Sequence, residues 1–111
     1  MKKEVIMNTY VTIVGFSNYY GKEPFKIGAE LLCEKEPDNS YDSEAIKVSL
    51  PVIGKVGYIA NGVNTKANGT LSAGRIYDRV DDKFSVKVRF TTASKVIAEL
   101  ITDFSEETLS F

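Results

Sequence analysis

The stretch EPDNSYDSEAIKV (36–48) leads through SLPVI into GKVGYIA (54–60). It begins with Pro, Asp, Asn and Ser, which favour a turn because they fix φ or bond their own backbone. Apolar and polar residues then alternate over 46–50, which is the two-residue period of a strand. The sequence therefore predicts a turn over 36–42, a strand over 46–50, a turn at LPVIG and a further strand over 55–60.

More strands are predicted on either side of this stretch. TYVTIVGF (9–16) is rich in β-branched and aromatic residues, which favour a strand. The loop SNYYGKEP (17–24) separates it from a loosely alternating strand over 26–35. KFSVKVRF (83–90) alternates apolar with polar residues throughout, and RIYDRV (75–80) is its predicted hairpin partner across a pair of aspartates.

Two helices complete the prediction. Residues 61–74 have weak helical spacing, but their Asn and Gly are poor helix formers, so this helix is expected to be short. Residues 92–104 place Val96, Ile97, Leu100, Ile101 and Phe104 at helical spacing, which predicts an amphipathic C-terminal helix.

The predicted order of elements is four strands, a short helix, a hairpin and a final helix. Many short strands separated by turns favour a mainly β fold, a small antiparallel barrel. A helix inserted midway is compatible with an OB-like barrel. We therefore expect a lead over 1–8, a single barrel domain over 9–91, the C-terminal helix over 92–104 and a tail over 105–111.

Composition narrows the classes of function. The chain of 111 residues has one cysteine, Cys33, and no histidine, which argues against a disulfide, a structural zinc site and histidine-based catalysis. Cys33 follows two leucines, and we expect it to be a buried packing residue. The N-terminus lacks the pattern of a signal peptide, and the chain has no apolar run long enough to span a membrane. A cytoplasmic protein with no membrane partner and no cofactor is expected.

The charge balance is unusual for a nucleic-acid coat protein. The net charge is −1 and the isoelectric point is about 5.5, whereas such proteins carry an excess of Lys and Arg. Residues 75–95 are locally basic. A three-residue hairpin loop would place Arg75, Tyr77 and Arg79 beside Lys87 and Arg89 as a basic face, and a loop one residue shorter or longer would turn the first three inward. The sequence leaves this register open.

The sequence offers only weak candidates for catalytic or metal-binding residues. Asp38 with Asp42, or Asp78 with Asp81 or Asp82, could act as acid and base or hold a metal, but aspartates in turns commonly bond their own backbone. Neither a calcium loop nor a phosphate-binding glycine loop is present. We therefore expect no catalytic residue and no metal site, and hold a metal-dependent nuclease as the least favoured alternative.

A surface for single-stranded nucleic acid is better supported. Such a surface needs aromatic rings for bases and cations for phosphates. Five tyrosines are predicted at loops or strand ends with several cations near them in the sequence. The alternative is that the tyrosines close the rim of the barrel with their hydroxyls in water. The residues are Tyr19, Tyr20, Tyr41, Tyr58 and Tyr77, with Lys22, Lys55, Lys66, Arg75, Lys87 and Arg89.

The two segments quoted first resemble the HIRAN domain. Its pattern is Glu/Asp-Pro-x-Asn-x-Tyr-Asp, then Ala-Ile-x-Val, then Val-Gly-Tyr/His-Ile/Leu, and this chain follows it over 36–60. The strand TIVGF (12–16) and its tyrosine loop resemble the start of that domain, so the similarity spans roughly 9–90. The resemblance implies an OB-like barrel that binds DNA, with single-stranded DNA or DNA 3′ ends as its partner, a role in DNA repair, and a helicase or other DNA-processing protein as a further partner.

The resemblance also implies roles for individual residues. Asp38 and Asn39 match turn residues that line the DNA pocket, Tyr41 matches a tyrosine that stacks on a terminal base, and Asp42 matches an aspartate that bonds the free 3′ hydroxyl. An aspartate repels phosphate but accepts a bond from a hydroxyl, so it selects a terminus. Cations of the family pattern are lost here, because Tyr58 replaces a histidine, Asn61 a lysine, and Ser17 and Asn18 an Arg-Tyr pair.

A second class of function follows from those losses. The barrel could serve as a protein-interaction or adaptor module whose DNA site is degraded. The partner would then be held by a strand edge or by the apolar stripe of residues 96–101. The two hypotheses differ in whether that stripe is exposed or covers the barrel.

Overall fold

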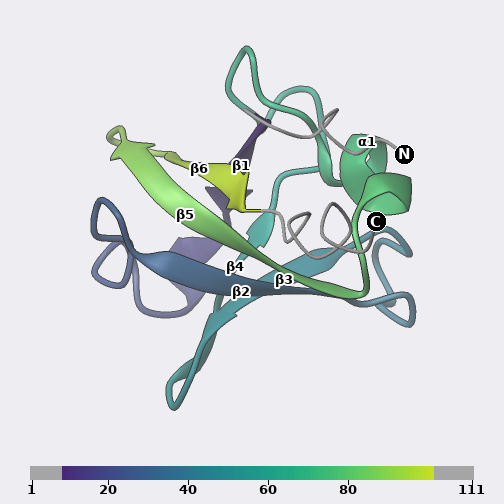
Figure 1. Cartoon of the computed structure of the whole chain (residues 1–111), viewed down its shortest axis with the longest axis horizontal. Coiled ribbons are helices and arrows are strands. Elements are labelled where there is room, and N and C mark those ends of the chain that lie inside the picture. Colours follow the sequence, from purple (N-terminus) through teal and green to yellow (C-terminus); the bar gives the residue numbers. More distant parts are fainter. Residues whose placement is uncertain (1–8, 102–111) are drawn as a thin grey trace, which may run out of the picture.

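Six antiparallel strands close into a barrel, with short helical turns between them (Figure 1). The computed structural model describes residues 9–101. The order around the barrel is β1-β4-β3-β2-β5-β6. The elements are β1 (Tyr10–Val14), η2 (Phe16–Asn18), β2 (Glu30–Lys35), β3 (Ile46–Leu50), β4 (Gly54–Ile59), α1 (Ala73–Ile76), η3 (Tyr77–Arg79), β5 (Lys83–Thr91) and β6 (Val96–Ile101).

The core follows from the alternation of each strand. Every second side chain points inward and is excluded from water, while its neighbours face outward. On β5, for example, Val86 and Val88 are fully buried and Lys87 lies between them at the surface side. The strongest contributors from the other elements are Ile13, Leu31, Ile46, Val56 and Ile76. Cys33 is buried among them as expected, and burial raises the pKa of its thiol.

The predicted C-terminal helix is wrong, because its described part is a strand. β6 pairs with β1 and with β5 and so closes the barrel. Val96, Ala98 and Leu100 alternate as buried residues, but Ile97, on the other side of the strand, is also buried. Burial on both sides produces apolar neighbours in sequence, and this resembles helical spacing. The barrel domain therefore extends past residue 91, and residues 102–104 of the predicted helix and the tail over 105–111 lie outside the described residues.

The strand predicted over 75–80 is also wrong. α1 and η3 occupy this segment, and they begin at Ser72, whose hydroxyl accepts a bond from the Arg75 amide at the helix start. Ala73 and Ile76 are buried at the spacing of one helical turn. The helix predicted over 61–74 is present only from residue 73, and 61–72 is an irregular connection. The hairpin predicted over 75–90 does not form, so the basic face that one of its registers would have produced is absent from the described residues. Arg89 instead pairs with Glu99 on β6.

The β3–β4 pair brings the backbone close to the core. The register shifts between Val48 and Ser49, and Gly57 lies opposite Val48 beyond this irregularity. A Cβ on Gly57 would lie 3.0 Å from both the Ile13 side chain and the Val14 carbonyl oxygen. Gly57 is therefore needed for close packing of β4 on β1.

We predict that Gly57→Ala destabilises the barrel by about 1–3 kcal/mol, because the added methyl group overpacks the contact with β1. Chemical denaturation followed by circular dichroism measures the change. Gly62→Ala is the matched control, since Gly62 is exposed and its Cβ would make an ordinary contact. Equal stability of the two variants would contradict the packing argument.

Candidate nucleic-acid interface

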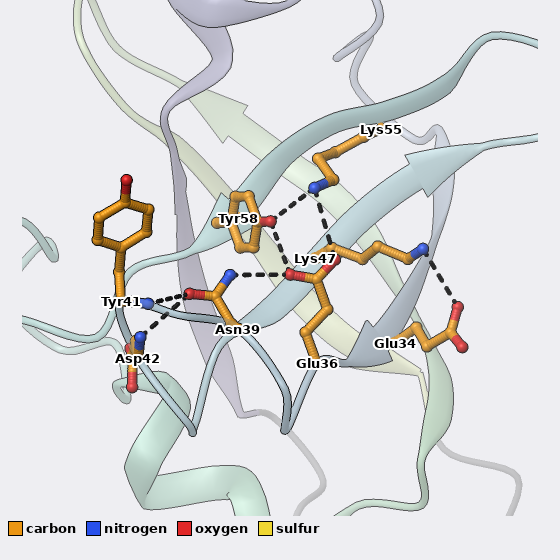
Figure 2. A network of polar contacts seen from close by, with 8 residues as sticks. All are labelled: Glu34, Glu36, Asn39, Tyr41, Asp42, Lys47, Lys55 and Tyr58. Carbon is orange, nitrogen blue, oxygen red and sulfur yellow. Dashed lines mark hydrogen bonds and ion pairs between the residues drawn. The ribbon is translucent and has the colours of Figure 1, made fainter.

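Asn39 organises the turn between β2 and β3. Its side-chain oxygen accepts bonds from the amides of Tyr41 and Asp42 at 2.8 and 3.0 Å, and its amide group donates to Glu36 Oε1 at 3.0 Å (Figure 2). Asparagine favours such turns because its side chain can replace a backbone acceptor. The turn therefore holds Tyr41 and Asp42 in a set orientation.

Glu36, Lys55 and Tyr58 join this turn to β4. The Tyr58 hydroxyl donates to Glu36 Oε1 at 2.7 Å and accepts from Lys55 Nζ at 2.6 Å. Lys55 Nζ also lies 3.4 Å from Glu36 Oε2 and 4.7 Å from the centre of the Tyr58 ring. The Glu36 carboxylate thus accepts hydrogen bonds from the Tyr58 hydroxyl and the Asn39 amide and forms an ion pair with Lys55.

These contacts change how the three groups titrate. Burial alone would raise the pKa of Glu36, but hydrogen bonds from Tyr58 and Asn39 and the charge of Lys55 outweigh burial and lower it. The hydrogen bond with Tyr58 raises the pKa of Lys55, and the charge of Glu36 adds to the effect. Burial raises the pKa of Tyr58. At neutral pH the network therefore consists of a carboxylate, an ammonium and a neutral phenol.

Asp42 is held by a second set of contacts. Its Oδ1 accepts from the Glu44 amide at 2.9 Å and its Oδ2 from Asn61 Nδ2 at 2.9 Å. The Gly74 amide donates to Asn61 Oδ1 at 2.7 Å, so the NH₂ group of Asn61 must face Asp42. A Cβ on Gly74 would lie 2.5 Å from Glu44 Oε1. A side chain at residue 74 would therefore require the exposed Glu44 carboxylate to move.

The tyrosines differ in exposure. Tyr41 is 95% exposed, and Figure 2 shows its ring standing clear of the polar network. Tyr20 and Tyr19 are 52% and 41% exposed; the Tyr20 hydroxyl donates to the Ile53 carbonyl oxygen at 3.4 Å, and Tyr19 precedes it in the same loop, directly after η2. Tyr58 is half-buried beside Lys55. Three of the predicted tyrosines, Tyr19, Tyr20 and Tyr58, therefore lie near the β3–β4 turn and Lys55.

The remaining predicted residues are less closely joined to the turn. Asp38 is exposed on the turn itself. Lys22 donates to the Thr92 carbonyl oxygen at 2.7 Å, which places it at the β5–β6 turn. Lys66 lies on the connection after β4, where the Ala67 amide donates to Thr12 Oγ1 on β1 at 2.9 Å. The structure thus brings together Asn39, Tyr41, Asp42, Asn61, Tyr58 and Lys55, but not Lys22 or Lys66.

Comparison with known proteins identifies the family of this chain. The family model of the HIRAN domain matches residues 6–100. The chain belongs to the HIRAN domain family. The match continues through β6, past the limit near residue 90 expected from the sequence.

A solved structure has the same fold as this HIRAN domain. The crystal structure of the HIRAN domain of human HLTF superposes with a TM-score of 0.62 at 18% identity, over 95% of this chain and 84% of that one. None of the curated protein sequences compared with the chain matches it. Family membership supports nucleic-acid binding as the general class of function, and the structural likeness supports the barrel fold.

Over residues 9–101, no cluster of three or more His, Cys, Asp or Glu side chains could hold a metal ion. No described helix is long and apolar enough to cross a membrane.

The sequence does not reveal the acids that complete the site. Glu36 belongs to the family motif, but nothing in the motif marks it as the partner of Lys55, and Glu44 gives no sign of its contact with Asn61. Glu34 pairs with Lys47 at 3.6 Å on the same face (Figure 2). Glu34 and Lys47 are directly opposite on β2 and β3, so the register of these two strands is the signal that would reveal that pair.

Partial burial and nearby carboxylates also mark the surroundings of Asp42. The pKa of Tyr77 on η3 is raised by burial and then by the charges of Asp82, Glu44 and Asp42. Carboxylates and the Lys35 ammonium, which is 4.7 Å from the centre of the Tyr77 ring, thus lie together at this end of the domain.

We predict that Asn39→Ala destabilises the domain by about 1–3 kcal/mol, because it removes three hydrogen bonds and leaves two turn amides without their acceptor. Urea denaturation measures the loss, and amide hydrogen exchange at Asp42 should accelerate. Ser40→Ala, at the exposed neighbouring position, serves as the control. Unchanged protection of the Asp42 amide in Asn39→Ala would refute this account of the turn.

Stability should also depend on pH through Glu36. Folding lowers the pKa of Glu36, so the ionised carboxylate stabilises the folded state. Its contribution to the free energy of unfolding is complete above the ordinary glutamate pKa and is lost as pH falls through the lowered pKa. Wild type should therefore exceed Glu36→Gln in unfolding free energy at pH 7, and the difference should shrink in acid. Denaturation of both proteins at pH 7 and pH 3 tests this, and a constant difference would contradict it.

Proposed function

We propose that this HIRAN domain binds single-stranded DNA and recognises its 3′ end, with no chemical step of its own. The observation that carries the proposal is Tyr41, an aromatic ring 95% exposed on a turn held rigid by Asn39. A tyrosine on a mobile loop would lose backbone entropy on binding a base, whereas a turn whose backbone is already held by Asn39 loses less. Family membership supports the same class of ligand.

The arrangement suits stacking and phosphate contact together. Tyr41 offers a free face to a base, and the partly exposed Tyr19 offers a second ring. Lys55 and the Tyr58 hydroxyl, which lie 2.6 Å apart, can donate to a phosphate. A bound DNA strand would thus find rings for its bases and donors for its backbone.

Asp42 is the residue proposed to select the 3′ end. Each carboxylate oxygen accepts one hydrogen bond in the structure, and each can accept a second. A 3′ hydroxyl could supply that bond. A 3′ phosphate or a continuing strand would place negative charge against Asp42 and the neighbouring Glu44, which is unfavourable.

The adaptor hypothesis loses its main support. Its apolar stripe required exposed side chains, but Val96, Ile97 and Leu100 are at most 7% exposed and belong to the closed barrel. A helicase or other DNA-processing protein remains part of the proposal as a partner that would act on the bound strand.

Replacement of Tyr41 by Ala should weaken binding of a single-stranded oligonucleotide by about 1–3 kcal/mol, because a stacking ring is lost. Fluorescence anisotropy with a labelled oligo-dT measures the affinity. Phe90→Ala is the matched control, since Phe90 is an exposed aromatic residue on β5 at 56% exposure. If both variants bind like wild type, stacking on Tyr41 is ruled out.

End recognition makes a separate prediction. Wild type should bind an oligonucleotide with a 3′ hydroxyl at least several-fold more tightly than the same strand with a 3′ phosphate, because Asp42 and Glu44 repel the added charge. A 5′ phosphate should have little effect and serves as the control. Equal affinity for the two 3′ ends would remove the role of Asp42 and leave general single-strand binding.

A further inference from the structure

Three donors of the proposed interface already hold an anion, and that anion is the chain's own Glu36. The Tyr58 hydroxyl is 2.7 Å and the Asn39 amide nitrogen 3.0 Å from Oε1, and Lys55 Nζ is 3.4 Å from Oε2. A phosphate of the DNA backbone presents the same kind of oxygen acceptors as a carboxylate, and an ammonium, a hydroxyl and an amide are donors suited to either. Glu36 therefore occupies the contacts that a phosphate would take.

We propose that Glu36 is a built-in competitor for backbone phosphate, which lowers the affinity of the domain for nucleic acid by holding Lys55. This inference rests on the proposed binding of single-stranded DNA and concerns what limits it. Binding on this face would exchange one anion for another at Lys55. The displaced carboxylate would remain close to the incoming phosphate.

The network is accessible enough for such an exchange. The side chains of Lys55 and Glu36 are 32% and 23% exposed, so solvent and ligand reach both. A surface ion pair of this kind is worth little net free energy, and a phosphate can compete with it. A deeply buried pair, in contrast, would be a fixed part of the core.

A second pair on the same face is neutralised in the same way. Glu34 lies 3.6 Å from Lys47. Lys47 on β3 is directly opposite Tyr58 on β4 in the register of these two strands. The acids along β2 and at its end thus cancel the two lysines of β3 and β4. The face on which the DNA strand is proposed to bind thus carries cations but has little net positive charge.

The exchange has a measurable consequence. Each phosphate neutralised by a protein cation steepens the dependence of affinity on salt, by about 0.7 in log–log slope for single strands. A lysine that carries its own carboxylate adds almost no net charge. Wild type should therefore show a shallow salt dependence. Removal of the Glu36 charge should leave Lys55 free to neutralise a phosphate and should make the slope steeper.

The test compares Glu36→Gln with wild type and with Glu23→Gln. The Glu36→Gln side chain keeps an oxygen that can accept from Tyr58 and Asn39, so the turn is retained. Glu23→Gln makes the same change in net charge at an 83% exposed residue that pairs with Lys26 outside the site. Anisotropy with a 3′-hydroxyl oligo-dT is recorded from low to moderate salt for each protein.

We expect Glu36→Gln to bind roughly three- to tenfold more tightly at low salt, with a slope steeper by about 0.7. Glu23→Gln should stay near wild type. In a Lys55→Gln background the gain from Glu36→Gln should disappear, because the gain comes from a freed Lys55. Binding by Glu36→Gln equal to or weaker than wild type overturns the competitor role while single-strand binding stands. No binding by wild type or Glu36→Gln at low salt overturns the proposed function itself.

A second measurement needs no variant. The pKa of Glu36, followed by carboxyl carbon NMR, should rise when wild type binds the oligonucleotide, since the carboxylate loses its donors and gains a nearby phosphate. An unchanged or lower pKa in the complex overturns the exchange even if Glu36→Gln fails to fold.

Discussion

Closure of the barrel by β6 is the constraint on which the other features depend. β6 pairs with β1 on one side and β5 on the other, so each described strand has a partner on both sides. Side chains such as Val86, Val96 and Leu31 fill the interior. The interior is therefore closed to a partner, and the outer face and the connecting loops are the surfaces on which one can bind.

The outer face carries its functional groups at particular places on this closed frame. The β2–β3 turn projects Tyr41 because Asn39 caps two of its amides, and Tyr58 on β4 reaches across to Glu36 at the end of β2. The start of α1 secures Asp42 through Asn61. The electrostatics are balanced because acids from β2 accompany the lysines of β3 and β4. An acidic protein of this family can thus present donors for a phosphate without a basic surface.

Local features are predictable from the sequence, and long-range ones are not. The turn at Asn39, the strand over 46–50 and the strand over 83–90 depend on neighbouring residues, so turn composition and two-residue periodicity predict them. β6 has the sequence pattern of a helix because Ile97 is buried on the side opposite Val96 and Leu100. The helical turn at 73–76 is too short to outweigh the strand-like residues that follow it, although Ala73 and Ile76 have helical spacing.

The same division holds for the site. Tyr41, Asp42 and Asn61 are identified by their places in a motif, and the structure brings Asp42 and Asn61 into contact beside Tyr41. Lys22 instead donates to the Thr92 carbonyl oxygen at the β5–β6 turn, and Lys66 lies on the connection after β4, beside Ala67, whose amide bonds to Thr12 on β1. The ion pair of Glu36 with Lys55 joins the end of β2 to β4, and that contact depends on strand register, which the sequence leaves open.

Nucleic acid is proposed to bind on the face formed by the β2–β3 turn and β4. Titration of the isotopically labelled protein with a short single-stranded oligonucleotide, followed by amide NMR, tests it most directly. The largest shifts are expected over 36–44 and 55–61, with small shifts over the β5–β6 turn. Shifts centred on the β5–β6 turn, or none at low salt, would contradict it.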